Sequence, residues 1–542
     1  MKTTTALLAL RGARLTYPGR AHAALEGIDF ELEAGAYTLV AGPTGSGKST
    51  FLKVLAGLLP GLSVCRLDGV RETAPGARCG VVFQSPDDQL FARRAFDEVA
   101  FGPRNLGLSE SETGRRVTDA LGAVGLSGSE DADPAALSGG QKQRLALAAA
   151  LALEPAALVL DEPFAQLDPQ GADEIRALLD RLRAERGVAL VLAEHRLGEL
   201  LEPSRAGGPQ RVLALDGGKV AWDAPTGDAA KYAPKLAELG LRLPVASEWA
   251  RRVPEAWAAG AYDRARALAW SREHLPRAAA PEAARKPGGS EILRADGLGY
   301  SYGGKGFALE GANFSLRRGE RVALLGANGS GKSTLLALLA GLRKPGAGRI
   351  ECAAARGYTF QNPDAMLIGA TALDETAFAP RWTLKLGRAA AEAKGRAALE
   401  AMGLGARSTE APLALSRGQR LRLAVAAVLA AEPEILLLDE PSTGQDRKHV
   451  ESLLQSVCAH GAAAVFSTHD PDLALEWADR AVVLRAGRVV ADGPALEVLN
   501  DTALLARTSL KRPALLEWCE ALGVPAARTL EELAARWSEA RA

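Results

Sequence analysis

The chain has 542 residues, of which 47% are hydrophobic and 24% charged, a composition typical of soluble globular protein divided into two or more domains. Lysine plus arginine and aspartate plus glutamate are equal at 65 each, so the net charge gives no support for a nucleic-acid partner. The five cysteines lack Cys-x-x-Cys spacing and no apolar run approaches the length of a membrane span. We therefore expect a reducing cytosol, and a membrane role only through partners.

The first predicted strand is the apolar run Ala6–Leu10, which is too short for a signal peptide. A second apolar run, Tyr37–Ala41, precedes a glycine-rich segment and then the apolar residues 51–55, which predicts strand, turn and helix. In that setting successive backbone N–H groups point at one anion and the helix N-terminus adds its dipole. We expect a phosphate-binding loop, with Lys48 at the outer phosphates and Ser49 on Mg²⁺. The expected ATP contacts are Gly42, Pro43, Thr44, Gly45, Ser46, Gly47, Lys48, Ser49 and Thr50.

The same loop returns after a second apolar run, Val322–Leu325. Its expected ATP contacts are Gly326, Ala327, Asn328, Gly329, Ser330, Gly331, Lys332, Ser333 and Thr334. Three more motifs recur in order: Leu-Ser-Gly-Gly-Gln at 137–141 and Leu-Ser-Arg-Gly-Gln at 415–419, Asp-Glu-Pro at 161–163 and 439–441, and the histidines His195 and His469. The offsets are nearly constant, at 284 (332 − 48), 278 (440 − 162) and 274 (469 − 195) residues. The chain is therefore predicted to be two copies of one domain.

The duplication extends beyond these motifs. Pro244 and Trp249 in the first copy match Pro513 and Trp518 in the second, both at an offset of 269 (513 − 244). Each copy is thus expected to carry its own helical tail. Alanine, proline, arginine and glycine crowd together at residues 275–290, which is typical of a linker. The predicted domains are residues 1–274 and 291–542, joined by that linker.

Within each copy, short apolar strands alternate with helical stretches. Examples are the predicted strand Val188–Ala193 and the predicted helix Gln141–Leu153. This alternation is typical of an α/β fold with a mostly parallel sheet covered by helices. A nucleotide then lies at the carboxyl ends of the strands.

Two carboxylates, Asp161 and Glu162, end an aliphatic run, as expected where a buried strand delivers acids to the edge of a sheet. Adjacent residues on a strand point in opposite directions, so the two can take different roles. We expect Asp161 to hold Mg²⁺ and Glu162 to orient or deprotonate the attacking water. The same roles are expected of Asp439 and Glu440.

The order of these motifs resembles the nucleotide-binding domain of ATP-binding-cassette (ABC) proteins, and the resemblance covers nearly the whole chain twice. It implies tandem α/β domains, each with a helical subdomain that carries the Leu-Ser-Gly-Gly-Gln signature. In that family two domains meet head to tail, and each ATP lies between the phosphate loop of one and the signature of the other. Site one would join Lys48, Ser49, Asp161, Glu162 and His195 to Ser416, Gly418 and Gln419. Site two would join Lys332, Ser333, Asp439, Glu440 and His469 to Ser138, Gly140 and Gln141.

The resemblance assigns the remaining family positions. Gln84 and Gln361 match the glutamine that contacts Mg²⁺ and water while linking to a partner subunit. The implied catalytic residues are Glu162, Glu440, His195 and His469, and the implied metal ligands are Ser49, Gln84, Asp161, Ser333, Gln361 and Asp439. The adenine-stacking aromatics would be Tyr17 and Tyr302, and the acids that couple the sites Asp168 and Asp446.

One position departs from the pattern, because Arg417 stands where the first copy has Gly139. If this position needs a positive φ, a side chain there costs about 1 kcal/mol. Site one is then expected to be somewhat weaker than site two but still hydrolytic.

The region after Gln84 resembles the ATPase subunits of energy-coupling factor (ECF) importers, where it forms a groove for a helix of the transmembrane subunit. Three apolar side chains lie there, Leu90, Phe91 and Phe101, and we expect all three to be exposed. The second copy drifts: Met366 replaces Gln89 and Ile368 replaces Phe91, while Asp374, Glu375 and Phe378 persist. The two grooves are expected to bind different helices, or one partner asymmetrically.

The predicted function is the ATP-hydrolysing subunit of an ECF-type importer for a vitamin, a vitamin precursor or a transition-metal ion. The resemblance implies ATP and Mg²⁺ as cofactors, a transmembrane coupling subunit and a substrate-binding membrane subunit as partners, no nucleic acid, and pairing of the two domains within the chain. It implies a peripheral position on the cytoplasmic face of the cell membrane. The alternatives are a twin-cassette ATPase of another ABC importer and a soluble ABC-type translation factor; the cargo stays open.

Overall fold

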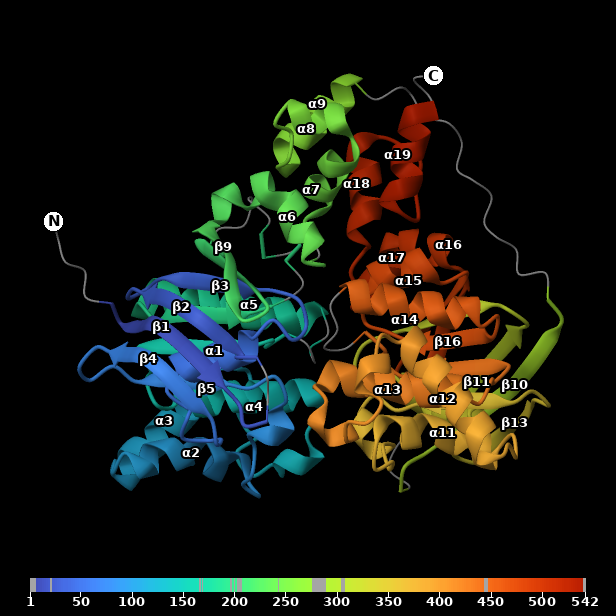
Figure 1. Cartoon of the computed structure of the whole chain (residues 1–542), viewed down its shortest axis with the longest axis horizontal. Coiled ribbons are helices and arrows are strands. Elements are labelled where there is room, and N and C mark those ends of the chain that lie inside the picture. The colour runs from blue at the N-terminus through green and yellow to red at the C-terminus, as the bar shows by residue number, and fades with distance from the viewer. Residues whose placement is uncertain are drawn as a thin grey trace. The chain divides into compact units, whose positions relative to one another are not determined.

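The computed structural model describes residues 6–19, 22–164, 167, 169–194, 197–198, 200–201, 207–241, 243–274, 289–303, 308–442 and 447–539. The chain divides into two compact units, residues 1–270 and 271–542 (Figure 1). Most of the predicted linker, residues 275–288, lies outside the described residues. Within the described part, no helix is both apolar enough and long enough to span a bilayer.

The first unit is built on a six-stranded sheet in the order β5-β6-β7-β3-β8-β9, in which only β9 is antiparallel to its neighbour. The strands are β5 (Cys79–Val82), β6 (Ala157–Asp161), β7 (Ala189–Ala193), β3 (Tyr37–Ala41), β8 (Arg211–Asp216) and β9 (Lys219–Pro225). Every residue of β3, β6 and β7 is buried, as expected for parallel strands covered on both faces. The α/β prediction is confirmed, and β7 begins one residue later than predicted.

A second sheet of three antiparallel strands, in the order β2-β1-β4, covers one face of the first. Its strands are β1 (Leu8–Thr16), β2 (Leu25–Leu32) and β4 (Arg66–Thr73). Helix α1 (Lys48–Leu55) shares this core, where the Phe51 ring meets Phe30 edge-on at 5.2 Å between centroids. The first strand is longer than the predicted Ala6–Leu10, because its alternating buried residues continue to Leu15 along this layer.

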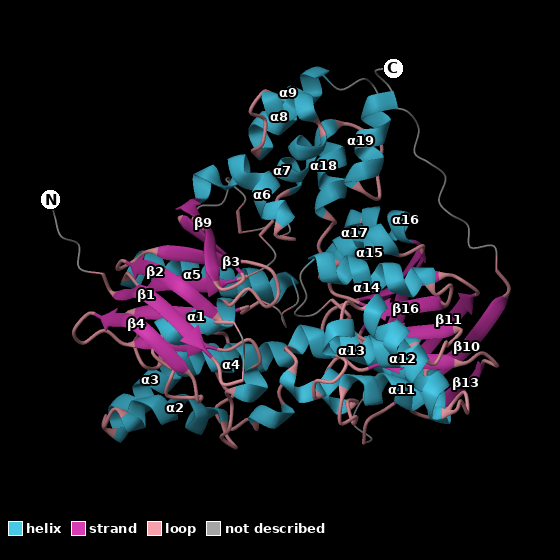
Figure 2. Cartoon of the chain, in the orientation of Figure 1, coloured by secondary structure: helices cyan, strands magenta, loops and turns pink. Residues whose placement is uncertain are grey.

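The opposite face of the main sheet packs against helices (Figure 2). These are α2 (Ala95–Asn105), α3 (Glu110–Ala123), α4 (Gly139–Leu151) and α5 (Pro169–Arg186), with 3₁₀ turns η1 (Pro86–Asp88) and η2 (Pro134–Ala136). Helices α2, α3 and α4 contact one another and form the predicted helical subdomain, in which α4 begins directly after the first signature serine. Helix α4 begins two residues before the predicted helix, because Ser138 caps it, and it also ends two residues earlier.

The second unit repeats this architecture with sheet orders β14-β15-β16-β12-β17-β18 and β11-β10-β13. Its strands are β10 (Glu291–Tyr300), β11 (Leu309–Arg317), β12 (Arg321–Leu325), β13 (Ala347–Glu351), β14 (Arg356–Thr359), β15 (Ile435–Leu438), β16 (Ala463–Ser467), β17 (Arg480–Arg485) and β18 (Arg488–Pro494). Its helices are α10 (Lys332–Leu339), α11 (Ala372–Trp382), α12 (Arg388–Ala401), α13 (Arg417–Leu429), α14 (Arg447–Ala459) and α15 (Pro471–Trp477), with 3₁₀ turns η4 (Pro363–Ala365), η5 (Gly405–Arg407) and η6 (Pro412–Ala414). Strand order and fold are therefore duplicated together with sequence.

A helical tail follows each cassette. The tail elements are η3 (Thr226–Tyr232), α6 (Ala233–Glu238), α7 (Val245–Arg252), α8 (Pro254–Ala258) and α9 (Arg264–His274) after the first, and α16 (Ala495–Asn500), α17 (Thr502–Arg507), α18 (Ala514–Leu522) and α19 (Leu530–Glu539) after the second. The matched residues Trp249 on α7 and Trp518 on α18 are both fully buried. The two matched tryptophans thus take equivalent buried positions on the tail helices.

Candidate functional site

The glycine-rich turn of each unit lies between a buried strand and a helix, β3 and α1 in the first and β12 and α10 in the second. Gly47, which precedes α1, has φ = 101°, and a Cβ there would lie 2.7 Å from the Ala24 carbonyl oxygen. Gly331 repeats this geometry with φ = 105°. A glycine is therefore required where the helix begins, and the backbone there is free to approach an anion closely.

The lysine of each loop folds back over it. Lys48 Nζ donates to the carbonyl oxygens of Gly42 at 2.7 Å and Pro43 at 3.0 Å, while Lys332 Nζ lies 2.8 Å from the Gly326 oxygen. Both lysines are more than 90% buried, which is rare for a cation unless it is held by such oxygens. Two positive charges are thus fixed at the centre of two loops of backbone donors.

One hydroxyl in each loop has no protein partner. Among the described residues, Ser46 Oγ and Ser330 Oγ are buried and make no hydrogen bond. A buried hydroxyl without a partner costs about 1–3 kcal/mol, and a phosphate oxygen in the loop would accept a hydrogen bond from it. In each loop, a hydroxyl without a protein partner fits an anionic ligand such as ATP.

In the first unit, Asp161 ends strand β6 beside the loop and is 8% exposed. Burial, and next the charge of Glu162, raise the pKa of Asp161 to about 6, against the hydrogen bond from the Ser49 hydroxyl. The Gln84 amide donates to Glu162 Oε2 at 2.7 Å. Hydroxyl, carboxylate and amide oxygens gathered here suit Mg²⁺, which prefers oxygen ligands.

In the second unit, Asp439 is 3% exposed, and burial raises its pKa against hydrogen bonds from the Ser467 and Ser333 hydroxyls. Glu440 Oε2 lies 2.9 Å from Nδ1 of His469. The predicted glutamine of this copy, Gln361, is exposed. The structure thus brings together a loop lysine, a hydroxyl, two acids and, in this copy, the histidine.

The expected strand alternation of the two acids is wrong. Strand β6 ends at Asp161, and Glu162 has φ = 47°; β15 ends one residue before Asp439, and Glu440 has φ = 51°. A left-handed non-glycine residue costs about 1–3 kcal/mol and is typical of functional sites. Both glutamates are therefore turned out of the strand by the backbone.

The predicted base-stacking tyrosines lie beside the loops. Tyr17 OH is 3.5 Å from Thr50 Oγ1, and Tyr302 OH is 3.3 Å from Thr334 Oγ1. The guanidinium of Arg343 lies 4.9 Å from the centre of the Tyr302 ring. Tyr17 lines an open cavity of about 670 Å³ together with Arg14, Thr16, Pro18, Gly19, Val64, Cys65, Arg66 and Asp68. Both tyrosines thus lie beside their phosphate loops, and their base-stacking role stays a prediction.

The signature serines cap their helices. Ser138 and Gln141 form a reciprocal capping box on α4, and Ser416 and Gln419 form the same box on α13. Arg417 is the first residue of α13 and has no left-handed backbone, so the strain expected at this position is absent. Arg417 and Gly139 take the same position in their helices, so backbone strain at Arg417 gives no reason for site one to be weaker.

Three predicted residues, His195, Asp168 and Asp446, lie outside the described residues. Their roles stay predictions.

The apolar surface after Gln84 is present. Phe91 is 64% exposed and Phe101 52% exposed, and their rings meet edge-on at 4.8 Å. Leu90 was expected to be exposed too; this is wrong, since Leu90 packs partly buried against the core. The carboxylate of Glu98, on α2 beneath this loop, accepts the N–H groups of Phe91 at 2.9 Å and Ala92 at 2.7 Å.

The second copy repeats this arrangement. Glu375 accepts the N–H groups of Ile368 at 2.7 Å and Gly369 at 2.6 Å. Ile368 is 70% exposed, and Phe378 and Trp382 are exposed on α11. Trp382 was missed from the sequence, although its position four residues after Phe378 on a helix was the available signal. We name these surfaces the first apolar patch (Phe91, Phe101) and the second apolar patch (Ile368, Phe378, Trp382).

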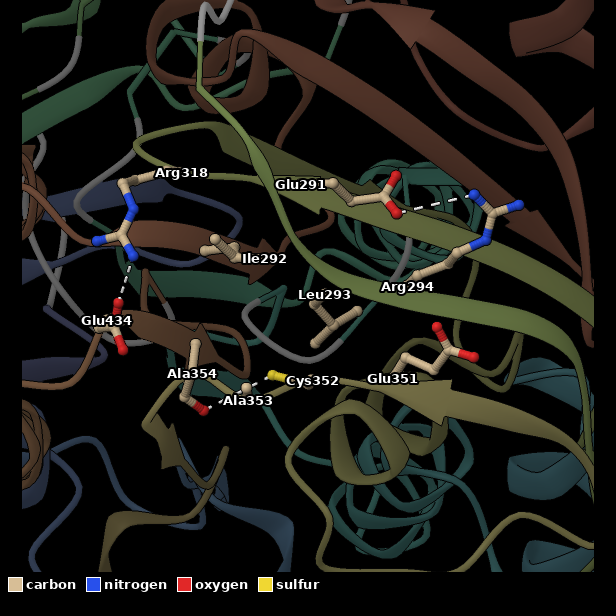
Figure 3. A pocket seen from close by; sticks show the side chains of 10 residues that line it. All are labelled: Glu291, Ile292, Leu293, Arg294, Arg318, Glu351, Cys352, Ala353, Ala354 and Glu434. Carbon is tan, nitrogen blue, oxygen red and sulfur yellow. Dashed lines mark hydrogen bonds and ion pairs between the residues drawn. The ribbon is translucent and has the colours of Figure 1, made fainter.

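Another pocket lies far from the phosphate loop within the second unit (Figure 3). It is lined by Glu291, Ile292, Leu293, Arg294, Arg318, Glu351, Cys352, Ala353, Ala354 and Glu434. Glu434 precedes β15 and Arg318 precedes β12, so the pocket lies at the amino ends of the parallel strands. The nucleotide loop lies at their carboxyl ends, and this pocket is therefore no part of the site.

Comparison with known proteins agrees with this geometry. The ABC transporter family profile matches residues 25–165 and 309–443. A Methanosarcina mazei protein with the provisional name ABC transporter ATP-binding protein is 36% identical over 556 residues, covering 96% of this chain and 94% of that protein. A Bacillus subtilis protein provisionally named HMP/thiamine import ATP-binding protein is 32% identical over 557 residues, covering 96% of this chain and 97% of its own.

The fold also resembles that of a solved structure. A chain in the structure of ribosome-bound archaeal Pelota and ABCE1 gives a TM-score of 0.65 at 19% identity, over 92% of this chain and 80% of that chain. At this identity the likeness is one of fold alone. With two matched cassettes and relatives along its full length, this chain belongs to the ABC transporter family as an ATP-hydrolysing, ATP-binding protein with tandem ABC domains.

Proposed function

We propose that this chain powers an ECF-type importer for a vitamin, a vitamin precursor or a transition-metal ion. The observation that carries the proposal is the first apolar patch, whose two aromatic rings are exposed on the loop and the helix that follow Gln84, the glutamine that contacts the catalytic glutamate. An exposed aromatic pair, with Phe91 on a loop held by Glu98 and Phe101 on α2, suits the apolar face of a partner helix. The name of the full-length Bacillus subtilis relative points to vitamin-type import as well.

The two nucleotide sites are proposed to be composite. Each pairs the phosphate loop and acids of one unit with the exposed signature serine of the other, Ser416 for site one and Ser138 for site two. Each signature serine is exposed within its own unit, with its helix N-terminus behind it, so it is available to a phosphate.

The two acids of each site are proposed to have different roles. Asp161 and Asp439, with the hydroxyls of Ser49 and Ser333, would hold Mg²⁺, which supplies charge neutralisation at the transferred phosphate. Glu162 and Glu440 orient and deprotonate the attacking water. The loop lysines bind the outer phosphates. ATP favours closure of the two units to the extent that the closed state binds ATP more tightly than the open state does.

Coupling to the membrane is proposed to run through Gln84. This residue joins the catalytic Glu162, at 2.7 Å, to the loop that carries the first apolar patch. Movement of that loop on hydrolysis would move a docked helix. The chain would thus act from the cytoplasmic face of the cell membrane, bound to a transmembrane coupling subunit and, through it, to a substrate-binding membrane subunit.

The test is a pull-down of tagged chain from detergent-solubilised native membranes, with every co-purifying protein identified. Recovery of a transmembrane coupling protein and a small substrate-binding membrane protein would support the proposal and indicate the cargo. A Phe91→Asp, Phe101→Asp double variant is the matched control and should recover less of both. Recovery of ribosomes, or of no membrane protein, would overturn the proposal and favour the translation-factor alternative.

A further inference from the structure

The second unit contains a buried hydroxyl that touches both acids of its site. Ser467, the last residue of β16, is fully buried; its Oγ donates to Asp439 Oδ1 at 2.6 Å and accepts the N–H of Glu440 at 2.8 Å. One hydroxyl thus fixes a carboxylate and the backbone of the next residue. A hydrogen bond to an ionised carboxylate is among the strong ones in proteins.

A second hydroxyl reaches the other oxygen of the same carboxylate. Tyr358 OH, from the neighbouring strand β14, donates to Asp439 Oδ2 at 3.4 Å. The Tyr358 ring is itself held edge-on by Phe360, at 4.9 Å between centroids. Strands on both sides of β15 therefore hold Asp439, through both of its oxygens. A carboxylate offers about four lone-pair positions, so the hydroxyls of Ser467, Tyr358 and Ser333 still leave one for a cation.

The first unit has the same backbone but neither hydroxyl. In its sheet Ala193 pairs with Asp161, and Val81 is the counterpart of Tyr358, since Val81 pairs with Val159 as Tyr358 pairs with Leu437. The N–H of Glu162 is accepted by the carbonyl oxygen of Ala193 at 3.1 Å. Ser467 and Tyr358 are therefore present in one copy of a duplicated site and replaced by apolar residues in the other.

We propose that Ser467 and Tyr358 are positioning residues that preorganise Asp439, so that the second site binds its divalent cation with nucleotide more tightly than the first. This inference rests on the proposed role of Asp439 as a metal ligand. The physical reason is that a carboxylate already held in one orientation loses little freedom when a cation binds. Removing a residue that orients a metal ligand typically weakens metal binding by about 10–100-fold.

The experiment measures Mn²⁺ binding by electron paramagnetic resonance in the full chain with the non-hydrolysable analogue AMP-PNP. A Lys48→Ala background leaves only the second site. Within it, Ser467→Ala, which installs the residue of the first unit, should raise the Mn²⁺ dissociation constant about tenfold or more. Ser467→Thr keeps the hydroxyl and should stay within about threefold of the parent, and Tyr358→Phe should show a smaller rise because its contact is longer.

The reciprocal change gives the matched control. In a Lys332→Ala background, Ala193→Ser offers Asp161 the missing donor at the same register position and should tighten Mn²⁺ binding several-fold. Binding of AMP-PNP in the presence of chelator should not change in any of these variants. If Ser467→Ala and Ser467→Thr bind Mn²⁺ as the parent does while nucleotide still binds, the positioning role is wrong and the proposed function stands. Failure of the unaltered chain to bind nucleotide would instead overturn the proposed function.

Discussion

The two units share strand order, phosphate loop and capping boxes, yet differ in the contacts around their acids. In the first, the Gln84 amide donates to Glu162, whereas the matching Gln361 of the second is exposed. Asp439 is also held by a hydroxyl where the first unit has Ala193. Duplication has preserved what strand and loop geometry determine and has changed what single side chains contact. The two sites are thus equal in architecture and unequal in detail.

The largest effect is expected from removing the two glutamates. The double variant Glu162→Gln, Glu440→Gln should lower steady-state ATP hydrolysis by about 100-fold or more, because each change removes a general base. Among the single variants, Glu440→Gln should cost more than Glu162→Gln if the second site holds its metal ligand better. Phosphate release and nucleotide binding are measured side by side. Equal hydrolysis rates of the two single variants would contradict the expected difference between the two sites.

The apolar patches are expected to differ in what they bind. Phe91→Ser should weaken capture of the membrane partner by about 30-fold or more if Phe91 is a buried anchor of the interface, because such anchors contribute about 2 kcal/mol or more. Ile368→Ser should reduce capture of the same membrane protein by a different amount than Phe91→Ser does, or it should reduce capture of a different membrane protein. Quantitative pull-down from membranes measures both. Nucleotide binding by each purified variant is followed in parallel, since a loss there as well would indicate misfolding, and identical capture profiles would show that the patches are equivalent.

The sequence predicted the parts of the molecule that depend on local chemistry. Glycines that require positive φ, such as Gly47, and buried aliphatic strands identified both loops, and the repeat identified both cassettes. The contacts of Ser467 could not be predicted, because they depend on β16 pairing beside β15 across 28 residues (467 − 439). The burial of Leu90 and the role of Glu98 depend in the same way on tertiary packing. The three-stranded sheet as a separate layer also followed from packing.

The buried acids should differ in their effect on stability. Burial raises the pKa of Asp161 to about 6 from 3.8, so its folded form binds more protons than the unfolded chain between these values. Stability is therefore lost as pH rises through about 4 to 6, and the cost at pH 7 is at most about 3 kcal/mol. Asp161→Asn should raise the Tm of the nucleotide-free chain at pH 7.

That gain should disappear near pH 4, where the folded carboxyl is already neutral. Asp439→Asn should gain less, because the Ser467 hydroxyl already stabilises the charged carboxylate. Thermal unfolding from pH 4 to 8 with chelator present makes the measurement. A gain for Asp439→Asn that equals or exceeds that of Asp161→Asn would contradict the difference between the two surroundings.

The smallest effect is expected at the signature. Arg417 is the first residue of α13 and takes the helical backbone of Gly139, so neither residue relieves strain there. Arg417→Gly should leave hydrolysis nearly unchanged and lower stability by less than about 1 kcal/mol, the cost of glycine in a helix. Gly139→Arg is the reciprocal control and should be equally mild. A several-fold rise in hydrolysis by Arg417→Gly would mean that the arginine side chain itself hinders the nucleotide, and the inequality of the two sites would then lie at the signature as well as at the acids.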